Sequence, residues 1–437
     1  MKALQIILYS VLSGILIFVS TPALRQLIEN PNFMEFREQF IFFTGICTMI
    51  FMTTAMLISL RIPLISKYLK GLDKAYSVHK NLGLAAAVSL SFHYLAEDAP
   101  KWLYNAGLLK INENYLSENN NEFFHESGLL AALIAFFLII ILLIITQIHK
   151  IPYHWFRSTH KIFSVVYLFA AYHAVLSLID RHWQFSLGGI LLIFIIFLGI
   201  IASLVSILAK IGEKRKFSAK IVKIDIFCKN ILDVYLSVEN QEFKYKAGQY
   251  VFLKFSFSSE PHPFTISSFD MKRKILRFSI KDLGDFTHNL FNIAKIGDEV
   301  EVEGAYGEFL FEDDFNRQIW IAAGIGITPF MARLDYFSTN KNNKQIFLFY
   351  SSRGHKNEIF PKDLEQICSL NNVKLIHVNT LENQRITIDF IKEKSGDLEN
   401  ASLWFCGNEN FGHSLLKWLK FSNFDMKNLH YDTFNMR

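Results

Sequence analysis

The chain has 437 residues, of which 51% are hydrophobic and 19% are charged, and it contains 43 Phe. This composition excludes a disordered, collagen-like or coiled-coil protein, and it argues against a purely soluble enzyme because typical soluble domains carry about 25% charged residues. The net charge of +5 is small for this length and gives no reason to expect a nucleic-acid partner. The four cysteines form no C-x-x-C pair, so neither a disulfide framework nor a zinc site is expected (Cys47, Cys228, Cys368 and Cys406).

The first half of the chain consists of long apolar runs separated by short polar segments. Four runs without a charged residue are long enough to cross a bilayer, which takes about 20 residues. Two further runs are less apolar because they contain His, Ser and Asn. We therefore expect a helical membrane domain over residues 1–212 with six transmembrane helices, namely Ala3–Leu24, Gln39–Leu60, Ser77–Ala96, Ser127–Ile148, Thr159–Ile179 and Phe185–Ala209.

The charges between the runs predict how these helices are oriented. The segments after the second, fourth and sixth runs carry an excess of Lys and Arg, which is typical of cytoplasmic loops. The acidic segment Glu97–Glu126 is then an outer loop, and both termini are cytoplasmic. The first run is longer than the apolar core of about 7–15 residues in signal peptides, so we expect a retained helix in a multi-pass membrane protein.

The second half of the chain has the pattern of two soluble domains. After Lys216, short β-branched and aromatic runs bounded by Gly, Asn and Asp indicate a β-barrel over residues 213–315. From Arg317, strands alternate with helical stretches, which predicts an α/β domain with a parallel sheet over residues 316–437. The expected strands are 217–226, 232–238, 249–255 and 276–280 in the first domain, and 319–323, 345–350, 373–378 and 402–406 in the second.

The third and fifth apolar runs each contain two histidines, which are costly inside a membrane and usually functional. His79 and His93 are 14 residues apart, and His160 and His173 are 13 apart, or about 20 Å along a helix. Because both runs cross in the same direction, His79 should face His160 and His93 should face His173. Two stacked bis-histidine sites would leave no open position on a haem iron and would suit electron transfer. The alternative is a set of scattered core histidines.

The helical phase fits one of these spacings better than the other. Fourteen residues return to within about 40° of the starting direction, whereas thirteen miss it by about 140°. Bending, side-chain rotamers or a local irregularity in the fifth helix must therefore compensate if His160 and His173 are to face the same partner helix.

An ordered pair of motifs in the predicted β-barrel is typical of a flavin site. Phe264 can lie against a flavin ring, Thr265 can hydrogen-bond the ring edge, and the backbone N–H groups of residues 284–287 can bind a pyrophosphate. Taken singly, each motif is also an ordinary strand or turn. The predicted flavin-binding residues are His262, Pro263, Phe264, Thr265, Ser267, Gly284, Asp285, Phe286 and Thr287.

The α/β domain opens with a strand, a Gly-rich turn and a helix start over Trp320–Phe330. Gly324 and Gly326 allow a dinucleotide to approach the backbone closely. The helix N-terminus at Thr328 and Pro329 favours its phosphates, and proline suits the first helical turn. The sequence therefore predicts a nicotinamide nucleotide site at this turn, although the motif is not G-x-G-x-x-G.

Two later positions extend the predicted nucleotide site. A strand ends in Phe-Cys-Gly-Asn, where Cys406 and Gly407 could border the nicotinamide. A buried structural cysteine is the alternative. Arg353, which follows the strand at 345–350, could hold a 2′-phosphate or could be a solvated loop arginine.

Taken together, these residues resemble the NADPH oxidase and ferric reductase superfamily. The four histidines resemble its six-helix bis-haem domain, and the HPFTISS, GDFT, GIGITP and FCGN motifs with the terminal YDTFNMR resemble its ferredoxin–NADP reductase-like half. The resemblance covers nearly the whole chain. It implies two b-type haems, FAD on the β-barrel and NAD(P)H on the α/β domain. Hydride would then enter on the inner side, and single electrons would leave to an acceptor outside.

The resemblance leaves the acceptor open. O2, reduced to superoxide, is the leading expectation, and a ferric chelate is the nearest alternative. A non-enzymatic haem-b conduit or redox sensor is an alternative of another class. Oxygen-reducing members often have a second His one turn beyond the outer ligand, where this chain has Glu97. Arg37 or Arg181 could supply positive charge there or could anchor the ends of the spans.

The resemblance also carries expectations about control and about the C-terminus. The sequence has no calcium-binding loop and resembles the simpler prokaryotic members, which implies a bacterial inner membrane and no obligatory regulatory protein. Phe434 resembles the family's aromatic residue that stacks on the flavin where the nicotinamide must bind. A last strand that buries Phe434 in the core is the alternative. Phe434 and Cys406 are the predicted catalytic positions.

Overall fold

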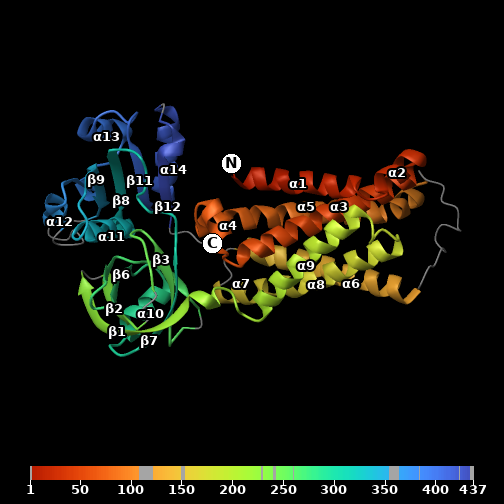
Figure 1. Cartoon of the computed structure of the whole chain (residues 1–437), viewed down its shortest axis with the longest axis horizontal. Helices are drawn as coiled ribbons and strands as arrows, with labels where there is room; N and C mark the ends of the chain where they lie inside the picture. The colour runs from red at the N-terminus through yellow and green to blue at the C-terminus, as the bar shows by residue number, and fades with distance from the viewer. Residues whose placement is uncertain are drawn as a thin grey trace. The chain divides into compact units, whose positions relative to one another are not determined.

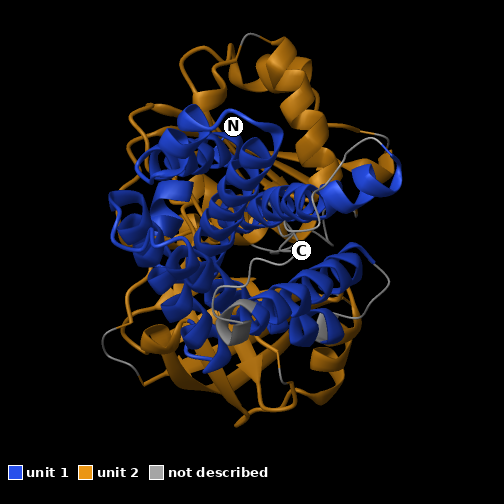
Figure 2. Cartoon of the chain, turned by 90° about the vertical axis from the view of Figure 1, so that its right-hand side faces the viewer, with its two compact units in different colours: residues 1–69, 74–211 blue, residues 70–73, 212–437 orange. Residues whose placement is uncertain are grey.

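The computed structural model describes residues 2–107, 122–148, 153–227, 230–239, 243–258, 260–353, 364–382, 384–422 and 424–433. The chain forms two compact units, shown in different colours in Figure 2. One unit comprises residues 1–69 and 74–211, and the other comprises residues 70–73 and 212–437. Each unit has its own hydrophobic core.

The described part of the first unit is built of helices and turns (Figure 1). Its long helices follow the predicted apolar runs, and short helices that the apolar pattern did not predict join some of them. The helices are α1 (Lys2–Val19), α2 (Ala23–Glu29), α3 (Phe33–Ser59), α4 (Pro63–Leu69), α5 (Leu72–Asn105), α6 (Glu122–Gln147), α7 (Tyr153–His160), α8 (Ile162–Asp180) and α9 (Leu187–Ile207).

Helix α3 contributes most to the core of this unit. Its Ile46 packs in one buried cluster with Tyr167 of α8 and with residues of α9. The Tyr167 hydroxyl forms a 2.6 Å hydrogen bond with Thr53 Oγ1 of α3. Glycine at position 199 of α9 makes room for this contact, because a Cβ atom there would lie 2.0 Å from the Tyr167 hydroxyl oxygen.

Much of the surface of this unit is apolar, as lipid contact requires. Large side chains such as Leu8 of α1, Phe137 of α6 and Phe197 of α9 are more than half exposed. Five helical segments in the described residues are long and apolar enough to cross a membrane: 2–19, 33–59, 126–147, 155–180 and 187–207. Helix α5 contains the predicted third span but is less apolar, so the count of six remains a prediction.

The predicted outer loop is wrong at both of its ends. Helix α5 continues to Asn105 and α6 begins at Glu122, so the first and last parts of the segment Glu97–Glu126 are helical. The acidic composition indicated a loop, but Glu, Ala, Lys and Leu are good helix formers in any solvent-facing helix. Helix α5 even continues through Pro100.

The second unit begins with a curled antiparallel sheet in the strand order β4-β3-β7-β1-β2-β6-β5. Alternate side chains such as Leu236, Leu253, Phe278 and Val300 fill its interior. The expected strands lie within a residue or two of the observed ones. The elements are β1 (Lys216–Phe227), β2 (Ile231–Val238), β3 (Tyr250–Phe255), β4 (His262–Thr265), β5 (Ser268–Asp270), β6 (Ile275–Lys281), α10 (Asp285–Ile293) and β7 (Glu299–Tyr306).

A parallel sheet in the order β10-β9-β8-β11-β12 completes the second unit. Helices α11 and α12 contribute to the core on one face, and α13 and α14 contribute to the core on the other, so the strands are buried on both sides, as in other parallel sheets. The elements are β8 (Arg317–Ala323), α11 (Thr328–Phe337), β9 (Gln345–Ser352), α12 (Leu364–Leu370), β10 (Val373–Asn379), α13 (Ile388–Ser395), β11 (Ser402–Gly407), α14 (Glu409–Phe421) and β12 (Leu429–Thr433).

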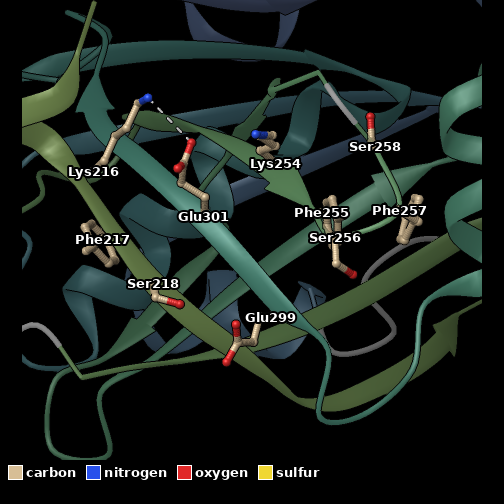
Figure 3. Close-up of a pocket in the computed structure, with 10 residues that line it drawn as sticks. All are labelled: Lys216, Phe217, Ser218, Lys254, Phe255, Ser256, Phe257, Ser258, Glu299 and Glu301. Carbon is tan, nitrogen blue, oxygen red and sulfur yellow. Dashed lines mark ion pairs between the residues drawn. The ribbon is translucent and has the colours of Figure 1, made fainter. Parts of the chain in front are cut away.

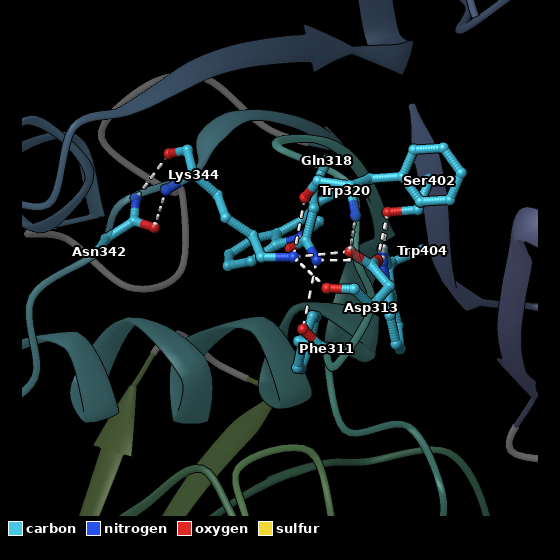
Figure 4. Close-up of polar contacts among 9 residues, drawn as sticks. Phe311, Asp313, Gln318, Trp320, Asn342, Lys344, Ser402 and Trp404 are labelled. Carbon is cyan, nitrogen blue, oxygen red and sulfur yellow. Dashed lines mark hydrogen bonds and ion pairs between the residues drawn. The ribbon is translucent and has the colours of Figure 1, made fainter. Parts of the chain in front are cut away.

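The amino-terminal edge of this parallel sheet is held by one buried carboxylate (Figure 4). Asp313 Oδ1 accepts from Lys344 Nζ at 2.6 Å, and its Oδ2 accepts from Ser402 Oγ at 2.5 Å, Gln318 Nε2 at 3.0 Å and Trp404 Nε1 at 3.2 Å. Burial raises the pKa of Asp313, but these donors outweigh it and hold the pKa below its usual value. Asp313 therefore ties together the residues at the starts of β8, β9 and β11.

Candidate functional site

The first unit brings the four predicted histidines together in two pairs. The rings of His79 on α5 and His160 on α7 have centroids 5.8 Å apart and are tilted by 59°. The rings of His93 on α5 and His173 on α8 have centroids 6.3 Å apart and are nearly perpendicular, at 88°. These are the partners that the spacing predicts. Scattered core histidines would not form two pairs along α5, one with α7 and one with α8.

Backbone carbonyls orient three of these four imidazoles. His79 Nδ1 donates to the Ala55 carbonyl at 2.9 Å, His93 Nδ1 to the Ile41 carbonyl at 2.9 Å, and His173 Nδ1 to the Gly128 carbonyl at 3.2 Å. A carbonyl oxygen can only accept, so the proton is on Nδ1 and the lone pair is on Nε2. Ligating histidines commonly have this second bond, which fixes the tautomer and the ring orientation.

His160 is held differently from the other three histidines. Its Nδ1 is buried and has no hydrogen-bond partner among the described residues. Aromatic rings surround it instead, with the Phe156 centroid 5.2 Å and the Phe163 centroid 5.0 Å from that of His160. Packing rather than hydrogen bonding therefore fixes this ring.

The fifth predicted span contains an irregularity in the stretch where the helical phase requires one. Helix α7 ends at His160 and α8 begins at Ile162, so the irregularity falls directly after the first histidine. At the break the Ser164 N–H bonds the Lys161 carbonyl at 3.1 Å, an i→i+3 contact that tightens the turn. The chain from His160 to His173 therefore does not follow one ideal helix, and each of the two rings lies next to a histidine of α5.

The geometry of the two pairs fits a haem held between axial imidazoles. Two imidazoles that bind one metal from opposite sides, through metal–nitrogen bonds of about 2 Å, have ring centroids roughly 6 Å apart. The two observed separations are 5.8 and 6.3 Å. Small residues lie nearby: a Cβ at Gly45 would be 3.4 Å from the His93 ring, and a Cβ at Gly83, one turn beyond His79, would meet no atom within 4 Å.

In the second unit, the predicted flavin residues gather where β4 meets α10. His262 of β4 stacks on Phe286 of α10, with ring centroids 3.6 Å apart and planes 19° apart. Phe264 lies on the same side, 6.3 Å from Phe286. His262, Pro263, Phe264 and Thr265 pair with β3 and are all half-buried. The two motifs are therefore neighbours in space, as a common ligand would require.

Thr287 shapes the turn that leads into α10. Its hydroxyl accepts from the N–H groups of Leu283 at 2.9 Å and Gly284 at 3.0 Å, and donates to the Gly284 carbonyl at 2.9 Å. The Gly284 N–H is thus already bonded. The groups left for an anion are the first N–H groups of the helix, those of Asp285, Phe286 and Thr287, which have no intrahelical acceptor. The predicted pyrophosphate contact therefore moves one residue along the chain.

Ser267 differs from the other predicted flavin residues because it lies in the interior of the sheet. It is 3% exposed, and its hydroxyl donates to Ser279 Oγ at 3.2 Å while accepting from the Ser279 N–H at 3.1 Å. These bonds join the segment between β4 and β5 to β6. Its role as a direct flavin contact remains a prediction.

The predicted nicotinamide residues meet at the carboxyl edge of the parallel sheet. Strand β8 lies between β9 and β11, so the chain changes direction across the sheet at this point. Ligands of open α/β sheets bind outside the carboxyl ends of the strands at this type of switch point. Gly326 passes so close to β11 that a Cβ there would lie 2.3 Å from the Cys406 carbonyl oxygen. Gly324, with φ +56°, meets no atom within 4 Å at its Cβ position.

The remaining predicted residues occupy different positions around this edge. Cys406 is 1% exposed, and burial raises the pKa of its thiol well above the usual value, so the thiol is protonated at neutral pH. Gly407 pairs with Thr433 at the end of β12. Arg353 follows β9 and is exposed. Thr328 and Pro329 are buried at the start of α11. Phe434 lies outside the described residues.

The antiparallel sheet of the second unit also carries a hollow of about 710 Å³ on the side formed by β1, β3 and β7 (Figure 3). Its walls combine the charged side chains Lys216, Lys254, Glu299 and Glu301 with serines and phenylalanines. Lys216 is paired with Glu301 at 3.7 Å. None of the predicted flavin or nucleotide residues lines this hollow.

Two kinds of functional group could not be found from the sequence motifs. The carbonyls of Ile41, Ala55 and Gly128 orient the histidines, but any residue has a carbonyl. Ser89 Oγ of α5 donates to the Thr44 carbonyl of α3 at 2.9 Å, between the two histidine levels. A polar residue inside an apolar run is the signal that could have marked Ser89.

Comparisons with known proteins agree with this organisation. The family described as a ferric reductase like transmembrane component matches residues 44–171, which contain three of the four histidines. A family described as an FAD-binding domain matches residues 216–308, which contain β4 and α10. Apart from residues 70–73, the first matched segment falls in the first unit, and the other falls in the second unit.

The chain is 22% identical over 232 residues to the reductase component of propane 2-monooxygenase from Rhodococcus jostii, covering 49% of this chain and 62% of that protein. It is 28% identical over 160 residues to respiratory burst oxidase homolog protein E of Arabidopsis thaliana, covering 30% of this chain and 17% of that protein. The chain thus spans less than two thirds of the length of these relatives.

Among solved structures, a flavohemoglobin from Malassezia yamatoensis with bound FAD and heme gives a TM-score of 0.51 at 16% identity, covering 91% of this chain and 99% of that one. This is a likeness of fold alone. The fused order of a ferric reductase-like transmembrane component and an FAD-binding domain, with the similarity to a respiratory burst oxidase homolog, places the chain in the NADPH oxidase and ferric reductase superfamily.

Proposed function

We propose that the chain is a transmembrane flavocytochrome that takes electrons from cytoplasmic NAD(P)H and delivers them to an acceptor on the outer side, with O2 giving superoxide as the first choice. The main support for the proposal is that the four histidines form two pairs, with ring centroids 5.8 and 6.3 Å apart. A single pair could be accidental, but two pairs that share α5 support two axial sites. Three of the four histidines also lie within the matched ferric reductase-like segment.

In this proposal each group of residues has one task. His79 with His160 and His93 with His173 hold two b-type haems, with His79 and His160 on the cytoplasmic side. The N-terminal N–H groups of α10, with His262, Phe264 and Thr265, hold FAD. Bound flavin would split the hydride pair into single electrons, and bound haem would accept them singly.

The chain's own residues account for the orientation of the bound groups. The carbonyls of Ala55 and Ile41 hold their imidazoles with Nε2 free for a metal. The turn from Gly324 to Thr328 offers backbone N–H groups to NAD(P)H, with Arg353 for a 2′-phosphate, and the buried Cys406 forms part of the base of that site. We also propose that Phe434 covers the flavin until the nicotinamide displaces it, and that no regulatory protein is needed.

Reduction of an anionic or neutral ferric chelate is the second candidate. It is favoured by Glu97, which stands where oxygen-reducing relatives often have a histidine, and by the description of the family that matches residues 44–171. The same scaffold and donor would serve both reactions. Only the outer acceptor differs.

The test uses the purified full chain with excess FAD and no calcium or other protein. NADPH oxidation is followed in aerated buffer by cytochrome c reduction that superoxide dismutase inhibits, and in anaerobic buffer by ferric-chelate reduction. Superoxide formation supports the oxidase, and chelate reduction without it supports the second candidate. Absence of NAD(P)H oxidation with any small acceptor would defeat both and favour a non-enzymatic conduit. A His182→Ala variant serves as a control, because this exposed histidine belongs to neither pair.

A further inference from the structure

Helix α5 contains a proline within its outer half. Pro100 lies inside the helix, seven residues beyond His93. A proline has no N–H group, so it cannot donate to the carbonyl four residues before it, and its ring also crowds that carbonyl. The carbonyl concerned belongs to Ala96, one turn beyond His93. The helix should therefore be weakest just outside the histidine.

Arg37 of α3 supplies the missing donor. Its Nε donates to the Ala96 carbonyl at 2.8 Å, and one Nη donates to the Glu97 carbonyl, also at 2.8 Å. The same Nη lies 3.2 Å from the Glu97 carboxylate, and the Arg37 side chain is only 12% exposed. These bonds are charge-assisted and therefore stronger than neutral ones. The guanidinium is thus committed to α5 and is not a free cation.

This contact lies beside the one that orients His93. Arg37 precedes Ile41 by one helical turn on α3, and Ala96 follows His93 by one turn on α5. The bond from His93 Nδ1 to the Ile41 carbonyl and the bond from Arg37 to the Ala96 carbonyl are therefore successive links between the same two helices. If α5 bent at the proline, the turn that carries His93 would tilt away from α3.

We infer that Arg37 is a positioning residue for His93: it replaces the hydrogen bond that Pro100 removes and so fixes the outer imidazole pair. The functional part of this inference rests on the proposed role of His93 as a haem ligand. The structural part concerns only the order of α5. His79, about four helical turns away on α5 and bonded to Ala55, should not depend on Arg37.

Proline itself provides the means to test this role. In Pro100→Ala the residue regains an N–H that can reach the Ala96 carbonyl, so the variant no longer needs Arg37. Four full-length proteins are compared: the natural chain, Arg37→Met, Pro100→Ala, and the double variant. Methionine keeps the length of the side chain and removes its charge and donors. Arg25→Met is the matched control, because Arg25 is 81% exposed and paired only with Glu29.

Two measurements are made on each protein. Amide hydrogen exchange of residues 93–105 reports the order of α5, and the low-spin ferric spectrum with its redox titration reports each haem site. In Arg37→Met this segment should exchange at least roughly tenfold faster, because two charge-assisted bonds to α5 are lost. It should also shift or lose the outer low-spin signal while the inner signal stays. The double variant should recover both readouts, and Arg25→Met should change neither.

The possible failures are distinguishable. If Arg37→Met changes neither readout, or if its defect persists in the double variant, Arg37 does not act by replacing the hydrogen bond that Pro100 removes, and the inference is overturned. If exchange changes and recovers as expected but the natural chain itself binds no haem, the proposed function fails while the role of Arg37 in α5 stands. Loss of both haem signals in Arg37→Met would also contradict a role confined to His93.

Discussion

The two units hold their candidate site residues in opposite ways. In the helical unit the chemistry lies in side chains: four imidazoles project from helix interiors, and backbone carbonyls orient three of them. In the second unit it lies largely in the backbone, at the turn Gly324–Ile327 and at the first N–H groups of α10. There, side chains such as Thr287 and Ser267 serve to hold the backbone in place.

This difference predicts opposite responses to mutation. If the imidazoles are ligands, as proposed, removing one of these side chains should abolish a site in the helical unit. In the second unit, adding atoms should do more harm than removing them, because the ligand would need the space that glycine leaves. Variants of one unit can therefore serve as controls for variants of the other.

The largest effect is expected from the histidines. His93→Ala should leave one low-spin haem per chain, and His79→Ala should remove the inner haem and prevent NAD(P)H from reducing the outer one, since each imidazole lies opposite one partner ring. Pyridine haemochrome analysis and the low-spin spectrum measure the content. Two intact haems in His93→Ala or in His173→Ala would show that the pairs are not ligands.

The next effect compares two glycines of the second unit. Gly326→Ala would place a Cβ 2.3 Å from the Cys406 carbonyl, so the turn must shift, whereas Gly284→Ala meets no atom within 4 Å and has extended backbone. Overpacking typically costs about 1–3 kcal/mol. We expect Gly326→Ala to lower the melting temperature and raise the KM for NAD(P)H, with Gly284→Ala close to the natural chain. Equal effects of the two substitutions on the melting temperature and on the KM would contradict this difference between the two glycines.

A smaller effect is expected at Thr287. Thr287→Val removes the acceptor of the Leu283 and Gly284 N–H groups and frees the turn before α10. With about 1 kcal/mol for a neutral hydrogen bond, FAD binding should weaken by roughly fivefold to tenfold. Thr287→Ser keeps the hydroxyl and should retain the affinity. Flavin fluorescence titration measures the dissociation constants, and haem content should stay constant in both variants.

The smallest effect is expected at Cys406. Burial raises the pKa of its thiol well above the usual value, so it stays protonated through pH 6–9. The stability gained from the neutral thiol is fully present below its unfolded pKa of about 8.5 and declines as the pH rises above that value. Cys406→Ala should therefore leave the pH profile of NAD(P)H oxidation between pH 6 and 9 unchanged. An inflection that disappears in this variant would show that the thiol takes part in proton transfer.

The sequence predicted best what depends on the type of residue. The strands at 217–226, 345–350 and 402–406 were placed within one or two residues, because β-branched and aromatic runs end at Gly, Asn or Asp. The four histidines were paired correctly because their heights follow from counting along two helices of the same direction.

The sequence failed where structure depends on contacts between distant segments. The break at Lys161 has no proline or glycine to mark it, although the phase argument required an irregularity in that helix. The helical turns around Pro100 were read as a loop, because their stabilising partner, Arg37, lies some sixty residues away in the chain. The position of Ser267 inside the sheet depends on Ser279, which only the register of β5 and β6 brings near.

Helix α3 provides backbone acceptors at the same spacing as the two histidines of α5. The carbonyls that receive His93 and His79 belong to Ile41 and Ala55, so the acceptors are separated by the same number of residues as the histidines. A one-residue insertion between His79 and His93 would turn one imidazole by about 100° and lift it by about 1.5 Å relative to its acceptor. A length change in this stretch of α5 would therefore need a matching change between Ile41 and Ala55 to keep both hydrogen bonds.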